Sequence, residues 1–304
     1  MNKKLAVIVF TIILVSSGFF LTEQKGAFAE MSGGHGHMRD DQGQHRHAVK
    51  AAEVIVDLET RPPEIKAGSM ATVLLSIKDI DGKPLQNLTI THERLVHVII
   101  ASEDFSIFAH IHPEDFGPVT PDMKKKAEFP VPFTFPKAGR YLIAVDSAVK
   151  DISFSEHFTL DVDGEPRMAQ YKKDLSQKKL FEGYEVTLSS EPKRIVAGKE
   201  ATLSYVIKKN GEGVKDLEPY LSALMHIAIV QADLNNFIHT HGELPGAVEG
   251  QHHMTGHMHM TVPEKFGPGI DAHVVFPAKG LYQVFGEIKH HGKVIVTSFM
   301  VEVE

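Results

Sequence analysis

Short runs of alternating apolar and polar residues, broken by turn residues, recur from residue 53 to residue 304. Side chains of a β-strand point to its two faces in turn, so this period of two predicts strands with one face in a core. Turns such as Asp81-Gly82 and Asn210-Gly211 separate several runs. Helical periodicity is scarce, and residues 118–132 are expected to form a Pro- and Lys-rich loop. The pattern is typical of all-β proteins built from antiparallel β-sandwiches.

The order of the predicted strands repeats once along the chain. The motif Phe-Pro-x-x-Gly-x-Tyr at residues 135–141 recurs at residues 276–282. We therefore predict two tandem Ig-like or cupredoxin-like antiparallel β-sandwiches, at residues 51–164 and 181–304, joined by a polar linker at 165–180. A single large sandwich is the weaker alternative. The second repeat also holds an insertion at residues 242–262 that the first repeat lacks.

Each repeat carries three histidines with the same spacing: a His, twelve residues, a second His, one residue, and a third His. The first triad is His97, His110 and His112, and the second, 129 residues later, is His226, His239 and His241. Two histidines separated by one residue on a strand point to the same face. If a neighbouring strand supplies the first His, each triad forms a three-nitrogen metal site with an open position. The alternative is ordinary hydrogen bonding on a sheet face.

The chain has no cysteine, and this narrows the chemistry of such a site. Thiolate zinc sites, disulfides and cysteine nucleophiles are excluded, so the ligands must offer nitrogen, oxygen or Met sulfur. Three imidazoles suit copper or zinc, with Cu(II) bound more tightly at equal geometry, whereas calcium and magnesium prefer carboxylates. Asp146 and Glu287 each lie five residues after a matched Tyr. They are candidates for a fourth ligand or for acceptors that orient an imidazole.

The insertion in the second repeat is rich in histidine and methionine. Its candidate metal ligands are His252, His253, His257, Met258, His259 and Met260. Imidazole combined with thioether is a soft ligand set that favours Cu(I), and zinc makes no use of Met. We therefore expect copper, as Cu(I) or Cu(II), to be the metal, with zinc as the alternative. A surface loop of biased composition is the other interpretation of the insertion.

The N-terminal residues predict export. Residues 1–29 have the basic start, the apolar run and the Ala27-Phe28-Ala29 cleavage pattern of a signal peptide, with a retained membrane anchor as the alternative. Residues 30–50 form a His-rich tail that we expect to be disordered. Cleavage changes the net charge from −7 to −9, because the signal holds three Lys and one Glu. An acidic exported protein is not expected to bind nucleic acid, and we predict an extracytoplasmic location: secreted, periplasmic or in the cell envelope.

A strand ending in His-x-His-Pro-Glu, at residues 110–114, precedes the Phe-Pro-x-x-Gly-x-Tyr motif and a closing strand. This order resembles the YtkA-like and CopC-like group of exported bacterial β-sandwich proteins, over about residues 50–164 and 181–304. The resemblance implies an Ig-like or cupredoxin-like sandwich and a copper-related role outside the cytoplasm. The chain departs from blue-copper cupredoxins, because without cysteine it cannot build their thiolate electron-transfer site.

Three classes of function fit these patterns. The first is a non-enzymatic metal-binding protein that holds or passes copper, a role that calls for a membrane or exported metal-handling protein as partner. The second is a zinc-dependent enzyme, because three imidazoles and an open position are also the ligand set of catalytic zinc. Neither a helix-borne zinc motif nor a nucleophile elbow occurs in the sequence. The third is a structural or adhesive sandwich module.

Overall fold

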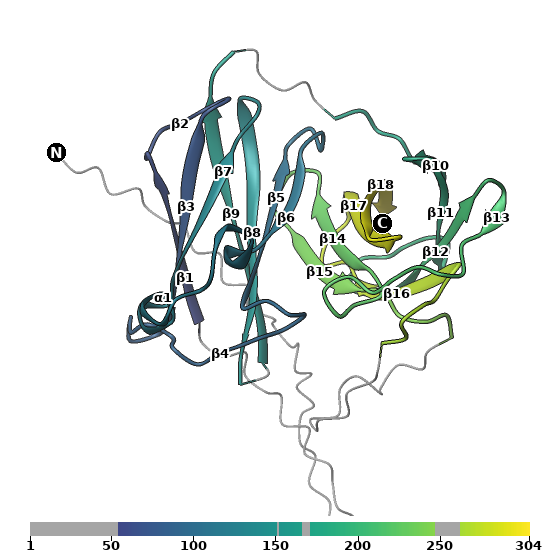
Figure 1. Ribbon diagram of the computed structural model, residues 1–304. Coiled ribbons are helices and arrows are strands. Elements are labelled where there is room, and N and C mark those ends of the chain that lie inside the picture. The colour runs from purple at the N-terminus through teal and green to yellow at the C-terminus, as the bar shows by residue number, and fades with distance from the viewer. Residues whose placement is uncertain (1–53, 151, 166–170, 247–261) are drawn as a thin grey trace, which may run out of the picture. The chain divides into compact units, whose positions relative to one another are not determined.

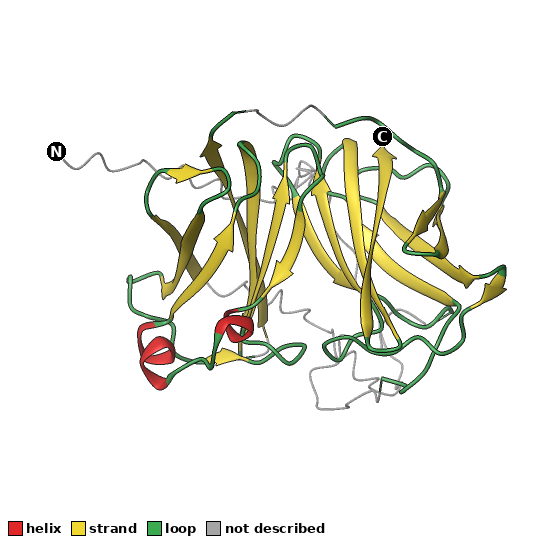
Figure 2. Ribbon diagram, turned by 45° about the horizontal axis from the view of Figure 1, so that its top comes forward, coloured by secondary structure: helices red, strands yellow, loops and turns green. Residues whose placement is uncertain are grey.

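Two antiparallel β-sandwiches follow one another along the chain (Figure 1), and Figure 2 shows how few of their residues are helical. This computed structural model describes residues 54–150, 152–165, 171–246 and 262–304, all within one compact unit, Val49–Glu304. The all-β sandwich fold predicted from the alternation is confirmed. The predicted signal peptide, the predicted His-rich tail and most of the insertion lie outside the described residues.

Sandwich 1 packs a three-stranded sheet, in the order β1-β3-β7, against a six-stranded sheet, in the order β2-β9-β8-β5-β6 with β4 paired to β8. Its strands are β1 Val54–Arg61, β2 Ile65–Lys66, β3 Met70–Asp79, β4 Leu88–Thr89, β5 Val96–Ser102, β6 Phe108–Ile111, β7 Glu128–Thr134, β8 Gly139–Val149 and β9 Ile152–Asp163. A 3-10 helix, η1 Pro113–Phe116, follows β6, and α1 Pro121–Lys126 precedes β7.

Sandwich 2 repeats this arrangement. One sheet has the order β10-β11-β12-β13 with β16 paired to β12, and the other has the order β15-β14-β17-β18. The strands are β10 Lys178–Phe181, β11 Tyr184–Glu191, β12 Glu200–Lys209, β13 Glu212–Gly213, β14 His226–Gln231, β15 Phe237–His241, β16 Gly269–Val275, β17 Gly280–His290 and β18 Lys293–Val303. Strand β10 begins inside the segment 165–180 that was expected to be linker.

The strands that carry the first histidine of each triad, β5 and β14, are buried on both faces. In β5, Val98 and Ile100 point into the core of sandwich 1, while Ile99 and Ala101 belong to a separate apolar cluster. This cluster draws on both sandwiches: Ile99, Ala101, Phe105, Leu142, Ala144, Ala228, Val230, Leu234, Phe285 and Met300. The β5-bearing and β14-bearing sheets therefore bury apolar surface against each other, which stabilises an inter-sandwich interface.

The Phe-Pro-x-x-Gly-x-Tyr motif fixes the start of β8 and of β17 in the same way. The hydroxyl of Tyr141 donates to the carbonyl of Lys137 at 2.9 Å, and that of Tyr282 donates to the carbonyl of Ala278 at 2.7 Å. A buried Tyr bonded to the backbone a few residues upstream is typical of Ig-like sandwiches. The resulting register sets Asp146 opposite His97, and Glu287 opposite His226.

Residues 118–132, predicted to be a loop, contain helix α1 and most of strand β7. The loop was predicted from the Pro and Lys content of this segment, yet two of its prolines, Pro130 and Pro132, lie in β7. Proline lacks the N–H that a central strand needs on both sides. Strand β7 lies at the edge of the order β1-β3-β7, so it is bonded on one side, and an edge strand tolerates proline.

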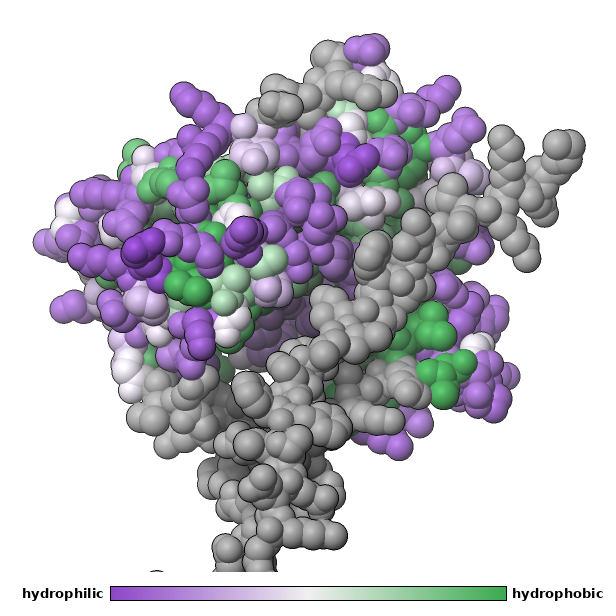
Figure 3. All heavy atoms as spheres, turned by 180° about the vertical axis from the view of Figure 1, so that it is seen from behind, coloured by the Kyte–Doolittle hydropathy of each residue, from purple (hydrophilic) through white to green (hydrophobic). Residues whose placement is uncertain are grey.

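One face of the molecule illustrates the polarity of its surface. Hydrophilic residues predominate on the face shown in Figure 3, with apolar residues in small separate groups, as is ordinary for a globular protein. Within the part of the chain that the structure describes, no helix is long and apolar enough to cross a membrane. Large apolar side chains are concentrated in the two cores and at the inter-sandwich interface.

Candidate metal centre

The first triad (triad 1: His97, His110 and His112) brings three ring nitrogens to one point. His97 lies on β5, His110 lies on the antiparallel neighbour β6, and His112 directly follows β6. His97 Nδ1 is 3.1 Å from His110 Nε2 and 3.1 Å from His112 Nε2, and the latter two atoms are 3.2 Å apart. His97 and His112 are fully buried, and the side chain of His110 is only 2% exposed.

The outer ring nitrogens of triad 1 determine which inner nitrogens carry lone pairs. His97 Nε2 donates to the carbonyl of Thr91 at 3.0 Å, and His112 Nδ1 donates to Asp115 Oδ2 at 3.0 Å. His110 Nδ1 donates to Glu287 Oε2 at 2.6 Å. Carbonyl and carboxylate oxygens only accept, so each outer nitrogen carries a proton. In the neutral form of each ring, which has one protonated nitrogen, the inner nitrogen then presents a lone pair.

The rings of the second triad (triad 2: His226, His239 and His241) pack much as those of triad 1 do, but their three nitrogens do not form one group within 4.8 Å: His226 is grouped with His239 and His110, and separately with His241 and His92. Centroids are 4.8 Å apart for His226 and His241 and 4.9 Å for His239 and His241, with interplanar angles of 84° and 57°. The matching pairs of triad 1 are 4.8 and 4.7 Å apart, also at 84° and 57°. Antiparallel pairing of β14 with β15 sets His226 opposite His241.

The inner nitrogens of triad 2 are the same atoms as in triad 1. His226 Nδ1, His239 Nε2 and His241 Nε2 are buried and have no hydrogen-bond partner among the described residues. His226 Nε2 donates to the carbonyl of Tyr220 at 3.1 Å, and His239 Nδ1 donates to Asp146 Oδ2 at 3.0 Å. A buried polar atom without a partner is costly, so these nitrogens mark a place where a ligand is expected.

The two carboxylates singled out in the sequence, Asp146 and Glu287, act across the interface. Each lies opposite the first His of its own repeat, yet each accepts from the middle His of the other repeat. Each accepts from the ring nitrogen that faces away from the cluster. They therefore act as acceptors that orient an imidazole, and not as a fourth ligand. The spacing in the sequence pointed to these residues, but only the packing of the two sheets determines which histidine each one contacts.

His92 is a candidate ligand that sequence reasoning missed. It lies in the turn before β5 of sandwich 1, and its ring stacks on that of His241 at 3.8 Å with an interplanar angle of 27°. His92, His226 and His241 each offer a ring nitrogen within 4.8 Å of the others. In the second repeat the matching position, 129 residues later, is Leu221. No repeated pattern marked His92, because only one repeat carries a histidine there.

Burial favours the neutral form of four of the six triad imidazoles: His97, His112, His226 and His241. Loss of hydration, the largest cause, lowers the pKa of His97 to about 3 and that of His112 to about 2. The same cause lowers the pKa values of His226 and His241. Because a metal binds the neutral imidazole, these side chains are in the metal-binding state at neutral pH.

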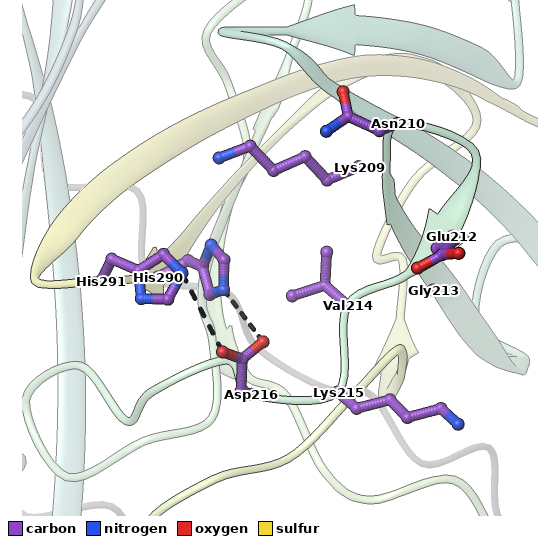
Figure 4. A pocket seen from close by; sticks show the side chains of 9 residues that line it. All are labelled: Lys209, Asn210, Glu212, Gly213, Val214, Lys215, Asp216, His290 and His291. Atoms are coloured by element: carbon purple, nitrogen blue, oxygen red, sulfur yellow. Dashed lines mark hydrogen bonds and ion pairs between the residues drawn. The ribbon is translucent and has the colours of Figure 1, made fainter.

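A third group, Asp216, His290 and His291, lines a surface pocket in sandwich 2 (Figure 4). Both ring nitrogens of His290 are already engaged: Nδ1 lies 2.7 Å from the hydroxyl of Tyr184, and Nε2 donates to Asp216 at 3.0 Å. With one nitrogen accepting and one donating, His290 has no free lone pair. This group therefore fits a structural role better than metal ligation.

Six candidate ligands from the insertion lie outside the described residues: His252, His253, His257, Met258, His259 and Met260. Their role in capturing copper stays a prediction from composition. The six triad histidines are all described, and the structure brings all of them to the inter-sandwich interface.

Comparison with known proteins identifies a family. A family model described as "Domain of unknown function (DUF8832)" matches residues 48–164 and again residues 178–304. The chain belongs to this family, and each sandwich corresponds to one copy of its domain. No curated protein is significantly similar to the chain.

Several solved structures are distantly similar. The Escherichia coli adhesin FdeC is 13% identical, with 84% of this chain and 65% of that one covered and a TM-score of 0.23. A bacterial integrin-binding invasin is 11% identical, with 81% of this chain and 39% of that one covered and a TM-score of 0.20. A Salmonella alpha-2-macroglobulin is 10% identical, with 83% of this chain and 15% of that one covered and a TM-score of 0.24. The chain thus spans less than two thirds of each of these proteins, and similarity at such TM-scores carries no functional information.

Proposed function

We propose that this chain is an extracytoplasmic, non-enzymatic protein that holds or passes copper in its two histidine triads. The arrangement of triad 1 carries the proposal. Three lone pairs face one buried point from atoms 3.1–3.2 Å apart, and each outer nitrogen is held by an oxygen acceptor. Lone pairs at such distances repel one another unless a cation lies between them, so the arrangement favours a bound metal ion.

The distances in triad 1 fit metal ligation. Tetrahedral ligation at about 2.0 Å places neighbouring ligand nitrogens about 3.3 Å apart. The measured separations of 3.1, 3.1 and 3.2 Å are close to this value. The contacts of His110 with Glu287 and of His112 with Asp115 have the form of the carboxylate–histidine–metal arrangement, in which the carboxylate orients the ring and raises its basicity.

The ligand set favours copper over zinc. Each triad offers imidazole nitrogen, for which Cu(II) has the higher affinity at equal geometry. The segment 252–260 adds thioethers, which suit Cu(I) and have no use in a zinc site. The resemblance of the strand motifs to YtkA-like and CopC-like proteins supports the same metal. Zinc is the alternative ion for the triads, since three imidazoles also bind it.

Burial favours holding the metal over catalysis at it. His97, His112 and His226 are 0–1% exposed, so a substrate would have to displace protein atoms to reach an ion among them. Catalytic zinc sites keep an accessible open position instead. Transfer of copper to an exported or membrane-bound partner would require the inter-sandwich interface to open. The extracytoplasmic location rests on the signal peptide predicted at residues 1–29.

The test is metal titration of the mature chain with Cu(II), with Cu(I) under reducing conditions, and with Zn(II). We expect the triple variant His97→Ala/His110→Ala/His112→Ala to bind one tight copper ion fewer than the unaltered chain. His291→Ala is the matched control, because its side chain is 68% exposed and outside both triads. Taking the difference between variants removes any contribution from the His-rich tail.

Each result of this titration has a clear meaning. Equal copper stoichiometry for the triple variant and the unaltered chain would refute the proposal. Tighter binding of zinc than of copper at the triads would replace copper by zinc. If no metal binds at all, the structural or adhesive module remains as the interpretation of the fold.

A further inference from the structure

The two triads are not separate sites, because their candidate ligand atoms form one continuous cluster. Three overlapping groups each contain ring nitrogens that lie within 4.8 Å of one another. One group is triad 1, the second joins His110 to His226 and His239, and the third joins His226 and His241 to His92. Ring centroids of opposite triads lie 5.2 Å apart for His110 and His226, and 5.7 Å apart for His97 and His239.

The contacts across the interface are reciprocal. The middle His of each triad donates to a carboxylate of the other sandwich: His110 to Glu287 at 2.6 Å and His239 to Asp146 at 3.0 Å. Between them, Ser222 donates to Glu93 at 2.6 Å, and these two residues occupy matching positions of the two repeats. Such self-complementary pairing is what a two-fold relation between two similar domains produces. The two halves of the cluster are therefore built to face each other.

Charge also favours two cations in this cluster. Glu287 is 8% exposed and Asp146 20% exposed at the side chain, and both contact imidazoles that point inward. Buried carboxylates are costly unless positive charge lies close to them. Two copper ions, one in triad 1 and one at His226 and the imidazoles grouped with it, would supply that charge through the ligating rings.

We propose that the two triads hold two copper ions as a single dinuclear centre at the inter-sandwich interface, with the carboxylate of each sandwich orienting the middle imidazole of the other. This inference rests on the proposed function, since it requires that both triads bind metal. It adds that the two ions interact, and that the centre exists only while the two sandwiches are docked. Neither repeat alone contains all the groups that hold its own metal in place.

Electron paramagnetic resonance of the Cu(II)-loaded mature chain is the test. The comparison uses the unaltered chain, a variant without triad 2 (His226→Ala/His241→Ala) and a variant without triad 1 (His97→Ala/His112→Ala). We expect a spin-coupled signal, with a half-field transition or loss of integrated intensity, when both triads of the unaltered chain are filled. Each double variant should give the spectrum of isolated Cu(II).

The outcomes distinguish failure of the dinuclear centre from failure of the proposed copper-binding function. If the unaltered chain binds copper at both triads and its spectrum equals the sum of those of the two variants, the dinuclear centre is refuted while copper binding stands. If no triad-dependent copper is found, both proposals fail. His112→Gln and His226→Gln, which keep a polar side chain of similar volume, replace the double variants should these not fold. Coupling that persists when either triad is disabled would also overturn the inference.

Discussion

Triads 1 and 2 are alike in how their rings pack and different in the groups that contact the third histidine. The interplanar angles are 84° and 57° in both, and the inner nitrogens are the same ring atoms. The first histidine donates to a backbone carbonyl six residues upstream in each case. The third histidine is where they diverge. His112 is held by Asp115, in the turn of η1, whereas His241 is covered by the stacked ring of His92 from the other sandwich.

This difference shows that the two triads depend unequally on their own repeat. Besides the imidazoles that face each other, triad 1 takes one hydrogen bond across the interface, to Glu287. Triad 2 takes two further groups from sandwich 1, the carboxylate of Asp146 and the ring of His92. Triad 2 also lacks a counterpart of the aspartate beside His112: Leu244 stands where Asp115 stands in repeat 1.

The largest expected effect comes from removing the third histidine of triad 1, with removal of the third histidine of triad 2 as the comparison. Changes outside the ligand shell cost about 10–100-fold in metal affinity, so loss of a direct ligand from triad 1 by His112→Ala should cost more than about 100-fold. His241→Ala should cost triad 2 only about 10-fold, because His92 remains beside His226. The copper affinity of each triad is measured by chelator competition, in a chain whose other triad has been removed by substitution. Equal losses would show that His92 does not act as a ligand.

The next largest effect tests the reciprocal carboxylates. Glu287→Gln, in sandwich 2, should lower the copper affinity of triad 1 by about 10–100-fold and leave triad 2 unchanged. Asp146→Asn, in sandwich 1, should do the reverse. Glutamine and asparagine keep a hydrogen-bond acceptor of the same shape, so the loss reports the charge that orients the imidazole. A loss confined to the triad in the same sandwich as the substitution would contradict the contacts across the interface.

A smaller effect is expected from His92→Leu, which copies the residue at the matching position, Leu221. Removing this ring should weaken copper at triad 2 by about 10-fold, since three imidazoles remain, and should leave triad 1 unaffected. The visible absorption of Cu(II) at triad 2 should shift as the ligand field weakens. The matched control is Leu221→Ala, which changes the same turn of the other repeat without removing an imidazole. A spectrum unchanged by His92→Leu would assign the ring a packing role.

The smallest effect is expected from Asp115→Asn. Its side chain is 37% exposed, so solvent screens its charge, and the amide oxygen can still accept from His112. We expect a loss of about 10-fold or less in the affinity of triad 1, at the low end of effects from outside the ligand shell. Isothermal titration in the chain without triad 2 can resolve it. A loss larger than that of Glu287→Gln would reverse the order of importance inferred from burial.

Local periodicity accounts for the parts of this protein that were predictable from the chain alone. Alternation of apolar and polar residues predicted the strands, because side chains of a strand point to its two faces in turn. The same rule put His110 and His112 on one face, and the repeat made His97 their partner. The loop predicted at residues 118–132 was wrong. Whether a strand tolerates proline depends on its place in the sheet, and Pro130 and Pro132 lie on an edge strand.

The sequence by itself determined the two sandwiches, the six histidines and their grouping in threes, because each depends on spacing within one repeat. Tertiary structure alone decided that the triads meet. The β5 and β14 sheets bury their outer faces against each other, and this places Glu287 at His110, Asp146 at His239 and His92 at His241. Contacts between residues 93 to 177 positions apart follow from which two surfaces pack together. Packing is set by the shape and apolar area of whole sheet faces, which no local pattern encodes.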